Sequence, residues 1–147
     1  MQTTVAGFND SSAEDVLFGN VVSTYTRAQA ISDGLLMDVT KVAKEAGFTW
    51  PVAITQAAWS DCVEWTDEDT RRQRYQDESG RLWDVVYMAA FAIKSGRGET
   101  GPVRLFKMWR VPRGGRRKTP QFKVLKMIVG PGDDAEPVIT IMLPSED

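Results

Sequence analysis

The stretch VRLFKMWRV, at residues 103–111, decides how the end of this chain folds. The period of the sequence changes here from helical to extended, which is typical of a strand. The stretches QFKVLKMIV at residues 121–129 and VITIML at residues 138–143 look extended in the same way. Glycines and prolines separate the three stretches, as they do in short connections between strands. We therefore expect an antiparallel meander of three strands.

Helical signals occupy the sequence before these strands. Residues 81–94 (RLWDVVYMAAFAIK) are apolar nearly all round, which predicts a helix in the centre of the core. Four further helices are predicted from the residues that cap or open them: Thr26, Thr40, Pro51 and Thr66. Helices followed by strands predict an α+β fold. The N-terminal helices should pack on the C-terminal three-stranded antiparallel meander in a single compact domain.

The helix opened by Pro51 is expected over residues 52–65. Within it Ile54, Ala58 and Cys62 fall on one face, which indicates a buried stripe. Cys62 is the only cysteine of the chain, and in such a stripe it is typical of a small buried hydrophobe.

The two ends of the chain lead to expectations about organisation and location. Residues 1–15 are predicted to be a loose leader, a strand is predicted over residues 16–24, and one domain is expected over residues 16–147. The polar leader lacks the pattern of a signal peptide, and the longest apolar run, residues 85–93, is too short to cross a bilayer. We expect a cytoplasmic protein with no membrane partner.

The residue inventory argues against several kinds of chemistry. No histidine occurs, which removes the commonest general base and a common metal ligand. Five acids cluster in the sequence at Asp61, Glu64, Asp67, Glu68 and Asp69. They could converge on a divalent cation, but helix capping and ion pairing explain them without one. We expect neither a metal nor a cofactor.

Charge is segregated along the chain. Residues 1–90 carry a net charge of −7, residues 91–126 carry +10, and residues 127–147 carry −5. The basic block lies on the expected hairpin and its connection, beside a tryptophan. Binding hot spots favour Trp and Arg. The predicted partner-binding residues are Trp109, Arg110, Arg113, Arg116, Arg117 and Lys118.

The basic hairpin has three interpretations. The leading one is a non-enzymatic protein that binds a partner with an acidic surface. The second is an accessory protein that binds nucleic acid, with cations on phosphates and Trp109 stacked on a base. In the third interpretation the hairpin binds no partner. Its Lys and Arg residues would then prevent an edge strand from pairing with other molecules, or would balance the charge of the acidic helices within the fold.

A small enzyme is the remaining alternative. Residues 75–84 hold Tyr75, Glu78, Arg81 and Asp84, and two carboxyl groups with divergent pKa values can perform acid–base catalysis. Capping explains the same residues, since this stretch joins two expected helices.

Several phrases together resemble a known family. They are YTRAQAISDGLLMDVT at 25–40, PVAITQAAW at 51–59, DCVEWTDEDT at 61–70, YQDESGRLWDVVYMAA at 75–90 and VGPGDDAEPVITIMLPSED at 129–147. The chain is similar, over residues 20–147, to a family of small bacterial proteins of unknown function that plasmids and integrated mobile elements often carry. The resemblance implies an accessory protein that inhibits a host defence complex by binding it, or that serves maintenance or transfer of the element.

Overall fold

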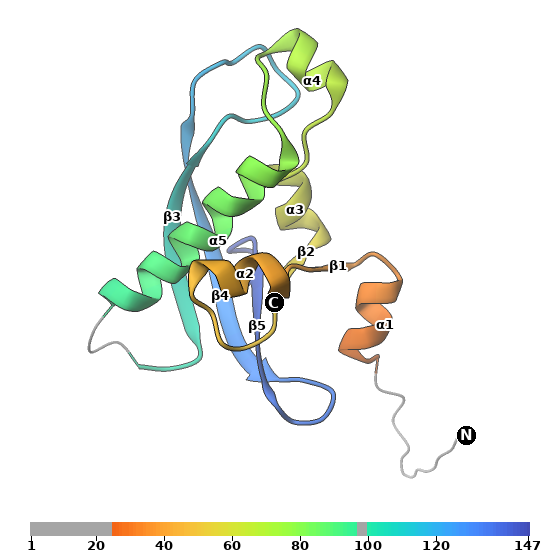
Figure 1. The fold of residues 1–147 in the computed structure, drawn as a ribbon, viewed down its shortest axis with the longest axis vertical. Coiled ribbons are helices and arrows are strands. Elements are labelled where there is room, and N and C mark those ends of the chain that lie inside the picture. Colours follow the sequence, from red (N-terminus) through yellow and green to blue (C-terminus); the bar gives the residue numbers. More distant parts are fainter. Residues whose placement is uncertain (1–24, 97–99) are drawn as a thin grey trace.

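The computed structural model describes residues 25–96 and 100–147. Figure 1 shows helices packed on a sheet whose hairpin reaches up to α4. The helices are α1 (Arg27–Ser32), α2 (Thr40–Ala46), α3 (Gln56–Cys62), α4 (Asp67–Arg72) and α5 (Glu78–Ser95). The strands are β1 (Leu36–Asp38), β2 (Val52–Thr55), β3 (Val103–Arg110), β4 (Gln121–Pro131) and β5 (Pro137–Met142). The predicted leader (residues 1–15) and first strand (residues 16–24) lie outside the described residues.

The sheet is mixed and has five strands in the order β1-β2-β5-β4-β3. The prediction of a three-stranded antiparallel meander was wrong, although the α+β class is right. As predicted, β3 pairs with β4 and β4 with β5, both antiparallel. In addition, β2 pairs with β5 in parallel, and β1 pairs with β2 antiparallel. The helices therefore do not all precede the strands, because β1 and β2 lie between α1 and α3.

Strand β2 occupies the residues that were predicted as the first turn of a helix. Val52 and Ile54 are fully buried towards the core, and Ala53 is buried on the opposite face. Burial of both faces is typical of a strand that pairs in parallel inside a sheet. The helix begins only after Thr55, whose side chain accepts a hydrogen bond from the Ala58 amide. The helical spacing of Ile54 with Ala58 was therefore coincidental.

Helix α5 is the central helix that the sequence predicts. Asp77 caps it, with the Gly80 amide donating to the Asp77 carboxylate at 2.7 Å. Its buried side chains include Val85, Val86 and Ala89, which pack on the sheet with α2 and α3. We call the sheet face under these helices the inner face; it carries the side chains of Phe106, Met108, Leu125, Met127, Ile139 and Ile141.

The caps of the short helices agree only in part with the sequence. Thr26 and Gln29 form the predicted capping box of α1. Thr40 is the first residue of α2 and not its cap; its hydroxyl accepts instead from the Val52 amide at 3.1 Å. Thr40 therefore ties α2 to the start of β2.

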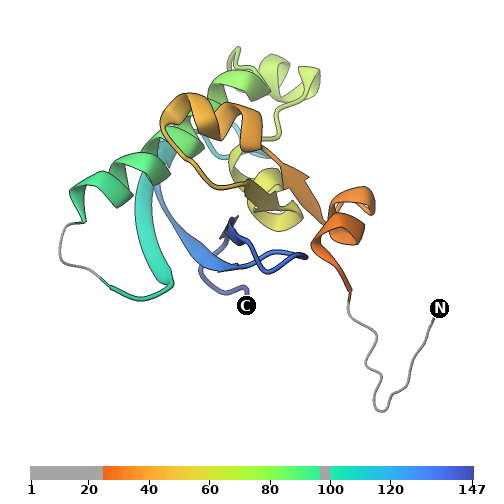
Figure 2. The ribbon, with the colours of Figure 1, turned by 60° about the horizontal axis from the view of Figure 1, so that its bottom comes forward.

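On the opposite, outer face of the sheet, Glu146 near the C-terminus accepts from Thr55 of β2 and from Lys126 of β4, and a helix covers one end of the face. There α1 lies against β5, and the Arg27 guanidinium donates to the Thr140 hydroxyl at 2.7 Å and to the Ile139 carbonyl at 2.8 Å. Figure 2 shows α2 and α5 on the same side of β3 and β4, with no helix on the other side of these two strands. In the described part of the chain, no helix is long and apolar enough to cross a membrane.

Candidate binding surface

The predicted site lies on the hairpin that β3 and β4 form. The register pairs Trp109 with Phe122 and Arg110 with Gln121. Because side chains alternate along a strand, neighbouring residues of the hairpin point to opposite faces of the sheet. The residues that the sequence grouped together are therefore divided between the inner and outer faces.

Arg110 points to the inner face and is paired within the chain. Its Nη2 lies 2.6 Å from Asp61 Oδ1 on α3, and Lys123 Nζ lies 3.1 Å from the other carboxylate oxygen. Burial would raise the pKa of Asp61, but the hydrogen bonds from Arg110 and Lys123 outweigh it and hold that pKa below its ordinary value. The Arg110 side chain is only 12% exposed, so its charge serves the fold.

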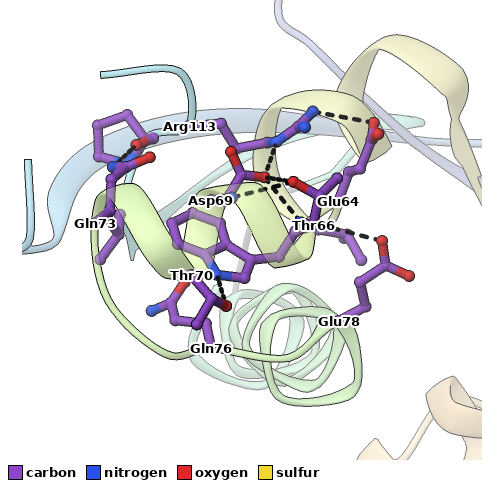
Figure 3. Close-up of polar contacts among 12 residues, drawn as sticks. Glu64, Thr66, Asp69, Thr70, Gln73, Gln76, Glu78 and Arg113 are labelled. Carbon is purple, nitrogen blue, oxygen red and sulfur yellow. Dashed lines mark hydrogen bonds and ion pairs between the residues drawn. The ribbon is translucent and has the colours of Figure 1, made fainter. Parts of the chain in front are cut away.

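Arg113 is also paired within the chain. Figure 3 shows its guanidinium between two carboxylates, with Nε 2.8 Å from Asp69 and Nη1 3.2 Å from Glu64. Asp69 is buried and also closes the capping box of α4, accepting from the Thr66 amide at 2.8 Å. Burial raises the pKa of Asp69, but hydrogen bonds from the Thr66 backbone and from Arg113 overcome that effect and lower it. The clustered acids therefore cap α4 and hold the hairpin.

Gln73 fastens the connection between β3 and β4 to the end of α4. Its buried side-chain amide donates to the Pro112 carbonyl at 2.7 Å and to the Arg117 carbonyl at 2.6 Å (Figure 3 shows the first contact). Arg74 adds a bond to the Lys118 carbonyl at 3.3 Å. The connection is thus held through its backbone as well as through the Arg113 side chain.

The cations of the connection are exposed. When the side-chain amide of Gln121 is oriented with its oxygen towards Arg117, this oxygen accepts from the Arg117 guanidinium at 2.9 to 3.1 Å. Arg116 and Lys118 are exposed, and no hydrogen bond or ion pair of their charged groups occurs with any other described residue. Of the five predicted cations, only Arg116 and Lys118 therefore remain wholly available to a partner.

Trp109 points to the outer face and is 61% exposed. Its ring meets the Phe122 ring edge-on, with centroids 5.6 Å apart and planes at 70°, and Lys107 Nζ lies 5.9 Å from the centroid of the Phe122 ring. The same face of β3 exposes two further apolar side chains. We call this surface the outer patch: Val103, Leu105, Lys107, Trp109 and Phe122.

A family model matches residues 16–147, and its description is family of unknown function (DUF6573). The chain belongs to this family. Comparisons with curated proteins and with solved structures found no match. The resemblance to an uncharacterised family is confirmed.

Four of the five members of the outer patch lie beyond the predicted site: Val103, Leu105, Lys107 and Phe122. The alternation in residues 103–111 places Leu105 and Lys107 on the same face as Trp109, so a signal for these two was present. Phe122 could not be assigned without the register, because a shift of one residue turns every side chain to the other face.

Exposed aromatic side chains also occur on α5, away from the hairpin. Trp83, Tyr87 and Phe91 lie at spacings of four residues, and all three are exposed. Trp50, after α2, is exposed as well. This stripe lies on a helix and shares no residue with the outer patch, so we use it as the control surface for binding experiments.

The groups of the enzyme alternative are kept apart. Glu78 accepts from the Trp65 amide at 3.2 Å and lines a shallow hollow of about 600 Å³ with Tyr75. Asp84 lines a different hollow, of about 60 Å³, with Arg81. Burial raises the pKa of Asp84, and Arg81 opposes the rise. Glu78 and Asp84 therefore do not form the acid–base pair that the sequence suggested.

Arg81 has a structural role. It is buried, its guanidinium lies 4.6 Å from the centroid of the Trp65 ring, and it donates to the carbonyls of Val63 and Val111 at 3.0 Å. These bonds join α5 to the end of α3 and the end of β3. Among residues 25–96 and 100–147, no group of three acidic, histidine or cysteine side chains is arranged to hold a metal ion.

An apolar cavity of about 330 Å³ lies at the far end of α5. Trp50, Ile93 and Met127 line it, with Lys94 and Arg104 as its charged members. None of the predicted site residues contributes to it.

Proposed function

We propose that this protein is a non-enzymatic binding protein that recognises a protein partner through the outer patch and the adjoining cations Arg116 and Lys118. The observation that carries the proposal is the exposure of Trp109 and Phe122 side by side on a sheet face without a helix. Contiguous exposed apolar surface of this kind is a mark of interaction sites in monomeric proteins. Trp with neighbouring Arg is also the composition of interface hot spots.

The charges favour a protein over a nucleic acid. Nucleic-acid binding rests on many simultaneous phosphate contacts. Arg110, Arg113 and Lys123 are engaged with carboxylates of this chain, so the tip offers only a few available cations. A few cations around an apolar centre suit an acidic protein surface, where the charges orient the partner and the aromatic rings supply affinity.

The biological setting is a proposal that rests on the resemblance described above. Small accessory proteins of plasmids and integrated elements often act by binding a host defence complex. We therefore place this protein in the cytoplasm of a bacterium, encoded by a mobile element and directed at such a complex. The lone buried thiol of Cys62 suits a reducing compartment.

The experiment is affinity capture from the cells that carry the gene, followed by binding assays with the identified partner in purified form. We expect Trp109→Ala and Phe122→Ala each to weaken binding at least about tenfold, a typical hot-spot effect. Trp83→Ala and Phe91→Ala, on the control surface of α5, should leave it within about twofold. Equal binding by all four variants would refute the proposal.

A charge reversal separates the two possible partner classes. Arg116→Glu with Lys118→Glu should weaken binding to the purified protein partner without lowering the melting temperature, because both side chains are exposed. Filter binding with DNA and RNA is the second arm. Tight nucleic-acid binding at low salt, with a steep linear loss in log–log plots against salt, would establish nucleic acid as the ligand.

A further inference from the structure

Strand β3 is an edge strand whose outward backbone groups can be assigned. It pairs only with β4 in the described sheet. The Val129 amide donates to the Pro102 carbonyl at 2.8 Å, so residues 102 and 129 form a hydrogen-bonded pair. Because such pairs alternate along an antiparallel ladder, the even-numbered residues of β3 bond to β4. The amides and carbonyls of Val103, Leu105, Lys107 and Trp109 consequently point to the open edge.

The residues that present this open edge also carry the outer patch. The edge runs for eight residues, its pairing with β4 continues without a bulge, and no proline interrupts it. Short strands, bulges and prolines are the usual devices that block an edge against a further strand. The device that remains on β3 is its charged side chains, and the sign of their charge decides which kind of strand could pair with this edge.

Every charged residue of β3 and β4 is positive. Two copies of β3 paired around Lys107 would bring the two Lys107 ammonium groups together on the outer face, which opposes self-pairing. A strand with an acidic residue opposite Lys107 would instead be attracted to β3. Its carboxylate would face Lys107, and its apolar side chains two residues away on either side would face Leu105 and Trp109.

We propose that the partner contributes an extended acidic segment that adds to β3 as a sixth, antiparallel strand. The segment has the pattern apolar-x-acidic-x-apolar. Its backbone bonds to the outward amides and carbonyls, while its side chains continue the outer patch. This inference rests on the proposed function and specifies how the same surface is used. Edge addition of this kind combines backbone affinity with side-chain selectivity at alternate positions.

A short peptide tests the pattern directly. The probe is acetyl-Thr-Val-Thr-Glu-Thr-Val-Thr-amide, and the control peptide has Lys in place of Glu. We expect the Glu peptide to bind at least about tenfold more tightly at low salt, and to slow amide hydrogen exchange at Leu105 and Lys107. Equal binding of the two peptides, or no binding at millimolar concentration, would overturn the inference.

Backbone substitutions separate edge addition from docking on the sheet face. N-methylation of the Glu residue removes an amide that faces β3, whereas N-methylation of a neighbouring Thr modifies an amide that points away. Only the first should abolish binding. In the protein, Leu105→Pro removes an outward amide and leaves the bonds to β4, and Leu105→Val keeps that amide. We expect the proline variant to lose the peptide and the valine variant to bind it at least about tenfold more tightly than the proline variant does; equal binding by the two variants would contradict edge addition.

The purified partner distinguishes the two proposals. If Trp109→Ala loses the partner while Leu105→Pro, folded by its circular dichroism, retains it, the partner docks on the face, and edge addition is wrong while the proposed function stands. If Trp109→Ala and Phe122→Ala both retain the partner, the proposed function itself fails. Should Leu105→Pro not fold, the pair of N-methylated peptides decides alone.

Discussion

Arg110 and Asp61 join the hairpin to α3 through a single carboxylate oxygen, which lies 2.6 Å from Nη2 and 2.7 Å from Nε. Lys123 lies on β4 opposite Met108 of β3, and its Nζ binds the second carboxylate oxygen of Asp61. Residues far apart in the sequence thus form one three-residue cluster at the edge of the core. Much of the basic character of the hairpin is neutralised here, within the fold.

Loss of this carboxylate should destabilise the protein. Asp61→Ala leaves two cations facing each other without a counter-charge, so the free energy of unfolding should fall by about 1–3 kcal/mol. Urea denaturation measures the change. Glu45→Gln, at an exposed position of α2, is the control and should have almost no effect. Equal effects of the two variants would contradict the assigned role.

The two carboxylates that hold the hairpin, Asp61 and Asp69, make stability sensitive to acid. The folded-state pKa values of Asp61 and Asp69 lie below the ordinary 3.8, so the unfolded chain binds more protons in that range. Their contribution is complete above pH 3.8 and is lost as pH falls through the lowered values. Asp61→Asn should be less stable than the wild type at pH 7, and the two should converge as pH falls through the lowered pKa of Asp61. A gap that stays constant with pH would show that charge is not the cause.

Cys62 should be unreactive while the protein is folded. Burial, with a smaller contribution from Asp61, raises the pKa of its thiol to about 11, so very little thiolate forms at pH 8. Labelling with a chromogenic disulfide reagent should be slow in buffer and fast in urea. Ser60→Cys adds an exposed thiol on α3 as an internal reference. Fast labelling of both thiols in the folded state would be inconsistent with the buried position.

Gln73 should control access to the loop that carries Arg116 and Arg117. Gln73→Met keeps the volume but removes both bonds to the loop carbonyls, so trypsin should cleave after these arginines several-fold faster. Limited proteolysis with mass spectrometry identifies the cleavage sites and rates. Gln56→Met, at an exposed position of α3, should cleave like the wild type. An unchanged rate for Gln73→Met would mean that the loop is held by other contacts.

Local signals explain which elements were predictable. The capping box of Thr26 with Gln29 and the apolar periodicity of α5 act between residues close in sequence, and both features are present as predicted. The same holds for the three C-terminal strands. In contrast, Val52 and Ile54 are compatible with both a helix and a strand over a few residues. Their pairing with β5, across more than eighty residues, decided between the two.

The candidate site divides in the same way. Alternation along residues 103–111 is a local property, and it already placed Leu105, Lys107 and Trp109 on one face. The position of Phe122 beside Trp109 depends on the register between two strands. Whether a cation is available depends on what lies opposite it in space, and Asp61 and Glu64 come from α3 and from the segment after it, far from the hairpin in sequence.

The sequence by itself determined that this is an α+β protein with a basic hairpin and a central apolar helix, because these properties follow from composition and short-range periodicity. Only the tertiary structure decided that the sheet is mixed and five-stranded, and that Arg110 and Arg113 are neutralised while Arg116, Lys118 and Trp109 stay exposed. Strand pairing and ion pairing join residues that are distant in the chain. Their energies depend on distances that no local pattern contains.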